Sequence, residues 1–72
     1  MTDTKLLNEI IDKSGYKRKY LADCLGISRF TLAKKIDNVT EFKLSEVDKL
    51  CKILKIESLY DRQRIFFAQK VD

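Results

Sequence analysis

The sequence contains no proline, histidine or tryptophan, and only two glycines and two cysteines among its 72 residues. Proline and glycine mark the tight turns of many-stranded folds, so their scarcity favours helices joined by few connections. A chain of this length supports one domain, which buries about 60% of the surface that the unfolded chain exposes. We therefore predict an all-α fold, a compact bundle of four to five helices, in a single domain over residues 1–72.

The missing histidine also removes the commonest acid–base group of enzymes. No glycine-rich loop for phosphate is present, and no pair of carboxylates lies in an apolar run that would raise its pKa. Cys24 and Cys51 stand alone inside apolar patterns, without a ligand set for zinc around them. We predict a non-enzymatic protein without metal, cofactor or small-molecule substrate, and we interpret both cysteines as small core residues.

Long hydrophobic runs are absent as well. The longest one, Ile65-Phe66-Phe67-Ala68, is far shorter than the stretch of about 20 residues that a membrane span needs. The polar start Met1–Thr4 is unlike a signal peptide. These features predict a cytoplasmic protein with no membrane partner.

Positive charge is concentrated in one region of the chain. The formal net charge is +4, but residues 13–35 alone hold seven basic residues against one acid, a balance of +6, and the rest has a balance of −2. A basic face is typical of a protein that binds a polyanion, although a solvated charged surface without a partner gives the same pattern.

Apolar residues at helical spacing predict four helices, at about residues 4–13, 17–25, 29–36 and 44–55. Asp3 or Thr4 can cap the first helix, and Gly15 and Gly26 can end the first two. Ser28 can cap the third helix.

The remainder of the chain is less regular. The fourth helix is expected to bury five residues of one stripe, Leu44, Val47, Leu50, Cys51 and Leu54. Ser58 can cap a fifth helix through Arg64, after which residues 65–68 suit either a short extended tail or a last helical turn.

The most informative element is the connection Gly26-Ile27-Ser28. It is too short to let the second and third helices lie antiparallel, so the pair must cross steeply, as in a helix-turn-helix with its core at about residues 17–38. Ala22 suits a corner at which two helices approach closely, and Gly26 suits a turn that requires positive φ. The side chains expected to fill the wedge between the helices are Leu25, Ile27, Leu32 and Ile36.

The stretch from Tyr20 to Leu32 resembles the helix-turn-helix of the Cro-type regulators of phages and bacteria, the XRE family. In that family an alanine, a glycine four residues later and an aliphatic residue six beyond that recur, and Ala22, Gly26 and Leu32 match them. The resemblance implies the phage-repressor type of fold. It also implies a transcriptional regulator that binds operator DNA in a genetic switch, within a bacterial host cell.

The resemblance extends through the helix at 44–56, and the ending Arg64–Ala68 is similar to small phage-encoded proteins of Gram-positive hosts. Two features depart from the commoner family pattern. No glutamine lies near Arg18, and Asn38-Val39 replaces the usual Asn-Gly after the third helix. Both differences concern the parts that would dock on the DNA backbone.

The resemblance further implies that the third helix enters the major groove of duplex DNA. The base-reading residues would then be Ser28, Arg29, Phe30, Ala33 and Lys34. The fork of Arg29 matches the two acceptors of guanine, and Phe30 and Ala33 suit thymine methyl groups. The alternative for Phe30 is that its ring folds back on the core of the domain.

Charge placement indicates a second set of contacts, to the DNA backbone. Basic residues oppose the positive end of a helix dipole, yet Lys17, Arg18 and Lys19 open the second helix without an acid in its first turn. The fourth helix, in contrast, has Glu46 in its first turn. An N-terminus surrounded by cations suits a phosphate. Further backbone candidates lie near or after the end of the third helix: Lys35, Asn38, Thr40 and Lys43.

A different function fits the same pattern. Some small phage proteins with a helix-turn-helix act as antirepressors, which dock on a partner repressor and block its DNA binding. Exposed apolar groups would serve such a contact, and the candidates are Phe30, Ile65, Phe66 and Phe67. The tail residues can instead pack on their own domain near the first helix, or form a homodimer.

Overall fold

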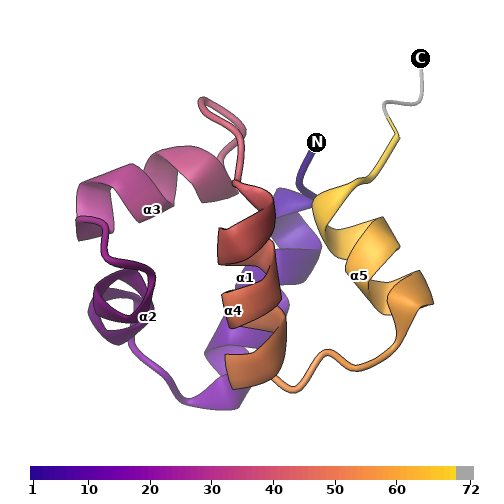
Figure 1. Ribbon diagram of the computed structural model, residues 1–72, viewed down its shortest axis with the longest axis horizontal. Coiled ribbons are helices and arrows are strands. Elements are labelled where there is room, and N and C mark those ends of the chain that lie inside the picture. The colour runs from indigo at the N-terminus through magenta and orange to yellow at the C-terminus, as the bar shows by residue number, and fades with distance from the viewer. Residues whose placement is uncertain (70–72) are drawn as a thin grey trace.

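The computed structural model describes residues 1–69, which fold into five α-helices (Figure 1). The helices are α1 (Thr4–Ser14), α2 (Arg18–Leu25), α3 (Arg29–Ile36), α4 (Leu44–Ile53) and α5 (Leu59–Phe66). The predicted all-α class is confirmed, and the predicted helix ends agree within about two residues. No helix in this part of the chain is both long and apolar enough to cross a membrane.

Helices α1 and α4 lie in the middle of the molecule, with α2 and α3 on one side and α5 on the other (Figure 1). The core is built from all five helices, and its fully buried side chains include Leu7, Ile11, Leu21, Leu32, Leu50 and Ile65. Cys51 is buried among them, and burial raises the pKa of its thiol. Helices α2 and α3 are therefore held by the same core that holds the tail.

One predicted core residue lies outside this core. Leu44 is 71% exposed, whereas Val47, Leu50 and Cys51 of the same stripe are buried. Leu44 is the first residue of α4. In that first turn the buried side chain is the charged one of Glu46.

The tail is helical and packs on its own domain. Helix α5 continues through Ile65 and Phe66, whose exposures are 1% and 4%, and the Phe66 ring meets that of Phe42 edge to face at 5.5 Å. The prediction that Ile65 and Phe66 belong to a protein interface is therefore wrong, because both fill the core beside α1. Phe67 ends the helix and is 44% exposed.

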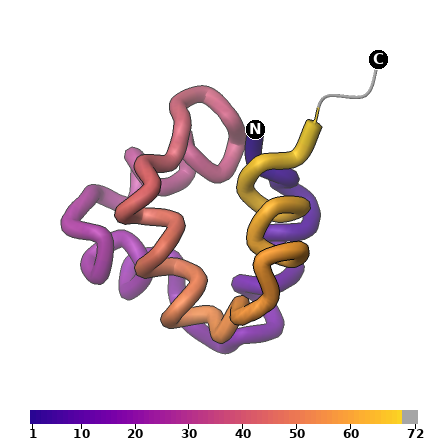
Figure 2. The backbone as a smooth tube through the Cα atoms, turned by 45° about the vertical axis from the view of Figure 1, so that its right-hand side comes forward, coloured from indigo at the N-terminus to yellow at the C-terminus, as the bar shows by residue number. Residues whose placement is uncertain are grey.

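The first three residues lie between two segments that are distant in the sequence. Figure 2 shows them beside the loop that joins α3 to α4 and beside the C-terminal end of α5. Asp3 accepts a hydrogen bond from the backbone N–H of Leu6 and so caps α1, as its position predicts.

Candidate nucleic-acid interface

The turn between α2 and α3 depends on Gly26. This residue ends α2 with φ 70° and ψ 28°. Its N–H donates to the carbonyl of Asp23 at 3.1 Å, and the N–H of Ile27 donates to the carbonyl of Ala22 at 3.0 Å. These two bonds close the helix in the Schellman arrangement. A Cβ at Gly26 would meet nothing within 4 Å, so the glycine is required for its backbone conformation and not for space.

The two helices that meet at this turn cross steeply, because α2 is seen almost end-on in Figure 1 while α3 lies across the view. Ala22 lies at the corner with 1% of its surface exposed, next to the buried Leu21 and Leu25. Leu32 and Ile36 complete the wedge from α3. The predicted helix-turn-helix geometry is present.

Ser28 is the N-cap of α3, and its hydroxyl makes two hydrogen bonds within the protein. The oxygen accepts a hydrogen bond from the backbone N–H of Thr31 at 3.0 Å, and the hydroxyl donates to the Thr31 side chain at 2.9 Å. This is an N-cap interaction. This capping role separates Ser28 from the other predicted readers.

The remaining predicted readers share one solvent-exposed face of α3. Arg29, Ala33 and Lys34 are exposed, and Phe30 is 70% exposed. The ammonium of Lys34 lies 4.8 Å from the centroid of the Phe30 ring, a cation–π contact. The alternative that Phe30 folds back on the core is therefore wrong. Arg29 takes part in no ion pair within residues 1–69.

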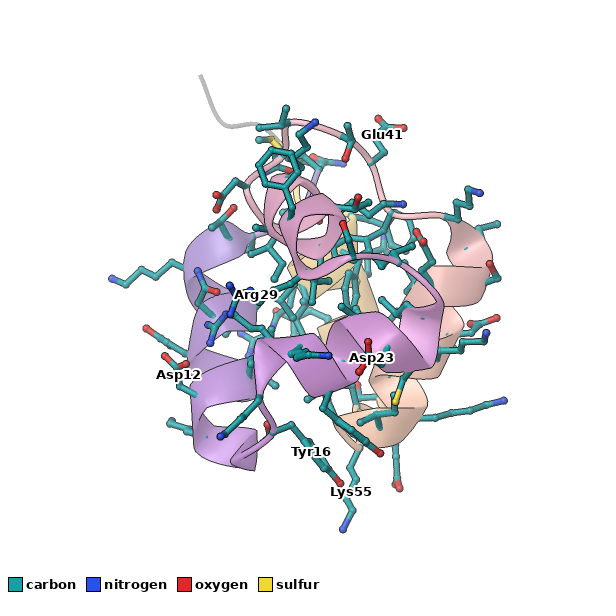
Figure 3. The ribbon with its side chains drawn as sticks, turned by 90° about the vertical axis from the view of Figure 1, so that its left-hand side faces the viewer. Asp12, Tyr16, Asp23, Arg29, Glu41 and Lys55 are labelled. Carbon is teal, nitrogen blue, oxygen red and sulfur yellow. The ribbon has the colours of Figure 1, made fainter. Side chains whose placement is uncertain are left out.

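A shallow basic groove lies next to this face, where the end of α1 meets the starts of α2 and α3. Its lining residues are Asp12, Gly15, Tyr16, Lys17, Arg18, Lys19 and Arg29. Figure 3 looks onto this side of the molecule, with Asp12, Tyr16 and Arg29 labelled around it. Lys17 is the N-cap of α2, and its side chain makes no capping hydrogen bond. The first backbone N–H groups of α2 therefore have no side-chain cap.

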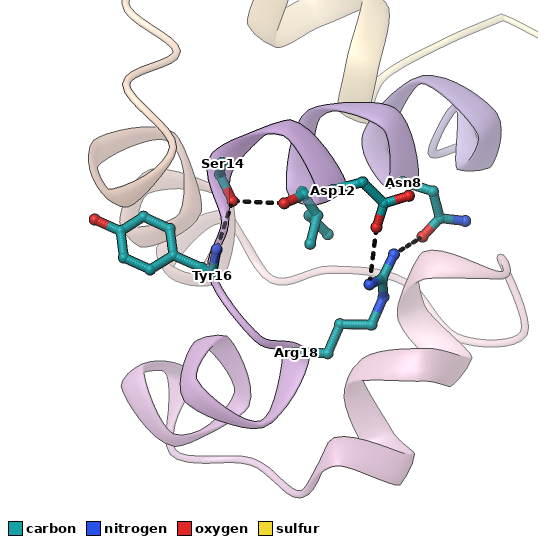
Figure 4. A network of polar contacts seen from close by, with 6 residues as sticks. Asn8, Asp12, Ser14, Tyr16 and Arg18 are labelled. Atoms are coloured by element: carbon teal, nitrogen blue, oxygen red, sulfur yellow. Dashed lines mark hydrogen bonds and ion pairs between the residues drawn. The ribbon is translucent and has the colours of Figure 1, made fainter.

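The side chain of Arg18 is 39% exposed but, unlike that of Lys17, makes hydrogen bonds within the protein. Its guanidinium donates to Asp12 at 3.2 Å and to Asn8 at 2.9 Å, both on α1 (Figure 4). The sequence predicts Arg18 as a backbone contact of DNA. The structure instead engages it in joining the start of α2 to α1. Lys19 makes only a long, exposed contact of 3.5 Å with Asp23.

The prediction of a DNA backbone contact is wrong for Lys35. Its ammonium donates to Glu46 on α4 at 2.6 Å, and the two side chains are only 9% and 7% exposed. Glu46 also accepts a hydrogen bond from the backbone N–H of Lys43. Burial by itself raises the pKa of Glu46. The hydrogen bonds from Lys35 and from the Lys43 backbone, together with the positive charges of these two lysines, lower the pKa by more than burial raises it, so the net shift is downward.

The three other backbone candidates lie at or after the end of α3. The side chain of Asn38 makes two hydrogen bonds to the backbone of Thr2. Thr40 and Lys43 are exposed in the loop before α4. The structure thus leaves four predicted backbone candidates exposed without strong internal bonds: Lys17, Lys19, Thr40 and Lys43.

Two features of this surface were missed by the sequence analysis. The rings of Tyr16 and Tyr20 stack at 5.2 Å, and their spacing of four residues across the start of α2 was the available signal. A hydrogen bond with Cys24 raises the pKa of the Tyr20 phenol, which stays protonated at neutral pH. The second missed feature is the pairing of Lys35 with Glu46, which no local sequence pattern could indicate because the two residues lie on different helices.

Comparison with known proteins agrees with this geometry. Residues 6–58 match the Cro/C1-type helix-turn-helix DNA-binding domain, and the chain belongs to that family. The match starts in α1 and ends at Ser58, the N-cap of α5, so it includes the turn at Gly26 and the whole of α3. No curated protein and no solved structure matches the chain. The protein is thus a DNA-binding helix-turn-helix domain.

Proposed function

We propose that this protein is a Cro-like transcriptional regulator of a phage genetic switch, which binds operator DNA with α3 in the major groove. The observation that carries the proposal is the exposed face of α3. Arg29, Phe30, Ala33 and Lys34 project from it together, and Arg29 has no ion-pair partner in residues 1–69. A cation without a partner on a helix that the family uses for DNA is free to bind a base.

The chemistry of the four side chains divides between polar and apolar readout. Arg29 can donate two hydrogen bonds to the O6 and N7 atoms of a guanine. Phe30 and Ala33 present carbon atoms, which suit the methyl group of thymine. Lys34 rests against the Phe30 ring and supplies a second cation next to it. We therefore expect an operator half-site that contains a guanine next to one or more thymines.

Contacts with the DNA backbone would hold α3 in register on the duplex. The exposed cations Lys17 and Lys19 and the uncapped N–H groups of α2 suit a phosphate on one side of the major groove. Thr40 and Lys43 in the loop after α3 suit a phosphate on the other side. Arg18, held by Asp12 and Asn8, would orient α2 without itself contacting DNA.

The test is a selection from a randomised duplex library with the wild-type protein, Arg29→Ala and Lys19→Ala. Arg29→Ala should cost about 1–3 kcal/mol on the selected site and relax its specificity, because a bidentate base contact carries sequence information. Lys19→Ala should weaken all sequences alike, because phosphate contacts do not discriminate between bases. If both variants lose affinity uniformly across the library, Arg29 does not read a base.

A salt titration tests the electrostatic part of the proposal. The logarithm of the association constant should fall with the logarithm of salt concentration at a slope of about −0.9 for each phosphate contacted. Lys17→Ala and Lys19→Ala should each reduce this slope by the amount that corresponds to about one phosphate. A binding constant that is independent of salt would contradict phosphate contacts altogether.

One observation favours a second function, that of an antirepressor acting on a phage repressor. Phe30 exposes 70% of its surface and Phe67 exposes 44%, and protein interfaces concentrate their energy in such aromatic side chains. The burial of Ile65 and Phe66 removes the rest of the apolar tail from this argument. A homodimer would use the same kind of exposed group.

The two functions differ in which side chain on α3 matters most. Base reading predicts that Arg29→Ala harms operator binding at least as much as Phe30→Ala. Antirepression predicts that Phe30→Ala or Phe67→Ala abolishes binding to a repressor, at a cost of about 2 kcal/mol or more. Calorimetry of each variant with operator DNA and with the repressor encoded next to its gene decides, with circular dichroism as the control for folding. Tight sequence-specific DNA binding without repressor binding would exclude the antirepressor.

A further inference from the structure

The N-terminal residues form a bridge between the end of α3 and the end of α5. On one side, Thr2 bonds to Asn38 with both of its backbone groups. The Thr2 N–H donates to Oδ1 of Asn38 at 2.7 Å, and Nδ2 of Asn38 donates to the Thr2 carbonyl at 2.7 Å. The side chain of Asn38 thus pairs with Thr2 as a neighbouring strand would. Thr2 is only 6% exposed.

The other side of this bridge is bonded to the tail. The N–H of Asp3 donates to the carbonyl of Ile65 at 2.7 Å, and the N–H of Ala68 donates to the carbonyl of Met1 at 2.8 Å. Figure 2 shows these first residues lying between the α3–α4 loop and the end of α5. Residues 1–3 therefore connect Asn38 to the C-terminal end of α5, which is distant from it in the sequence.

Further bonds join the same segment to α3 itself. The Thr4 hydroxyl donates to the carbonyl of Ile36 at 2.6 Å and accepts from Nδ2 of Asn38 at 3.3 Å. Ile36 is the last residue of α3, and its carbonyl has no partner in the helix. Asn38 and the first turn of α1 together close the C-terminal end of the helix whose exposed face carries the proposed base readers.

Asn38 is also the residue at which the chain changes direction. Its φ is 63°, and the next two N–H groups, of Val39 and Thr40, fold back to the carbonyl of Lys34 at 2.8 and 3.3 Å. The loop that follows carries Thr40 and Lys43, the proposed phosphate contacts on this side of the groove. A displacement of Asn38 would move both of them relative to α3.

We propose that Asn38 is a positioning residue for DNA binding, which acts through its paired hydrogen bonds with Thr2. By holding the start of the α3–α4 loop against residues 1–3, it places Thr40 and Lys43 in register with the base contacts of α3. The inference rests on the proposed function for its DNA part. Asn38 does not itself contact the duplex, because its side-chain atoms are engaged within the protein.

A simpler role for Asn38 must be separated from this one, since asparagine tolerates positive φ better than most residues. The chain provides a matched control in Lys55, which has φ 59° and no hydrogen bond from its side chain in the described part of the protein. Glycine at either position relieves the backbone. Only Asn38→Gly also removes the bonds to Thr2 and Thr4.

The experiment compares wild type, Asn38→Gly and Lys55→Gly by amide hydrogen exchange and by binding to the selected operator over a range of salt concentrations. Measurements are made at a temperature at which thermal unfolding shows all three to be fully folded. In Asn38→Gly the amides of Val39 and Thr40 should exchange at least about tenfold faster, which corresponds to about 1.4 kcal/mol of local opening. The salt slope should become shallower by about 0.9 for each phosphate that the variant no longer binds.

Lys55→Gly should leave both the exchange rates and the salt slope as in the wild type. Equal exchange at Val39 and Thr40 in all three proteins would overturn the positioning role. If the wild type binds operator and Asn38→Gly binds it with the same affinity and slope, the DNA part of the inference is wrong while the proposed function stands. If the wild type selects no duplex sequence, the proposed function is wrong. Faster exchange in Asn38→Gly would then show that Asn38 holds the loop against residues 1–3 without a role in DNA binding.

Discussion

The two ends of α3 contain similar residues in opposite environments. At the N-terminal end, Arg29 is exposed and pairs with no acid in residues 1–69. At the C-terminal end, Lys35 is buried and donates to Glu46 at 2.6 Å. One helix of eight residues therefore carries one cation that holds the fold together and another that remains available to a ligand.

The difference changes how the basic region of the sequence is understood. The balance of +6 over residues 13–35 includes Lys35 and Arg18 as surface charge. Both are paired with acids on other elements, Lys35 with Glu46 on α4 and Arg18 with Asp12 on α1. The exposed cations of this region are instead Lys13, Lys17, Lys19, Arg29 and Lys34. Lys17 and Lys19 lie at the start of α2 and Arg29 at the start of α3, whereas Lys34 lies in the last turn of α3.

The largest expected effect is at the buried end. Lys35→Met should leave the Glu46 carboxylate buried without its cation and lower the free energy of unfolding by about 3–5 kcal/mol. Denaturant unfolding measures the loss. The double variant Lys35→Met, Glu46→Gln should recover most of it, because glutamine still accepts the N–H of Lys43 without a charge. If Lys35→Met is as stable as the wild type, the pair does not contribute as its burial indicates.

The turn before α3 should give the next largest effect. Gly26→Val forces a β-branched residue to φ 70°, which should cost about 2 kcal/mol or more. For a domain of this size, each kcal/mol corresponds to about 4–8 °C in the melting temperature. Gly15→Val is the matched control, since Gly15 has φ 79° and also has space for a Cβ. Both should lower the melting temperature, and a melting temperature unchanged by Gly26→Val would mean that the turn does not depend on positive φ.

Acid sharpens the comparison further, because the cation at the buried end of α3 is paired with a carboxylate whose pKa is lowered. The pKa of Glu46 lies below its ordinary value of 4.5 in the folded protein, so its contribution to stability is fully present above that pH. The contribution is lost as the pH falls through the lowered pKa. Unfolding measured between pH 7 and pH 3 should therefore show a smaller acid-induced loss in Glu46→Gln than in the wild type. Parallel curves for the two proteins would contradict this linkage.

The smallest expected change in stability is at the exposed end. Arg29→Met should alter the free energy of unfolding by no more than about 0.5 kcal/mol, since no acid depends on it. This is the substitution made at Lys35, on the same helix and with the opposite expected result. A loss of more than about 1 kcal/mol in Arg29→Met, measured by denaturant unfolding, would mean that the two ends of α3 differ less than their contacts indicate.

The elements that the sequence analysis predicted well are those set by neighbouring residues. Helix α3 begins at Arg29 after the cap of Ser28, and α2 ends at Gly26 because an αL residue is needed there. The errors concern side chains with distant partners. Lys35 was interpreted as a surface residue because its partner, Glu46, lies 11 positions away, and the bonds of Asn38 to Thr2, 36 positions away, were not foreseen for the same reason.

Exposure was also misjudged in both directions for apolar residues. Leu44 has the spacing of a core residue but is the first residue of α4, and it is 71% exposed. Phe66 was a candidate for an interface, yet it meets Phe42 in the core. Helical periodicity gives the direction of a side chain around its own axis, but it does not say whether a neighbouring element covers that point.

By itself, the sequence determined the all-α class, the positions of the helices and the turn at Gly26, because each of these depends on interactions within a few residues of the chain. Only the tertiary structure decided which cations are free, since burial and ion pairing require α1, α4 and the N-terminal segment to be in place. Arg29 remains exposed and Lys35 does not, because Arg29 is left in solvent in the first turn of α3 while the side chain of Lys35 reaches Glu46 on α4. The proposed DNA-binding surface is therefore built on cations of a basic sequence that the fold leaves exposed.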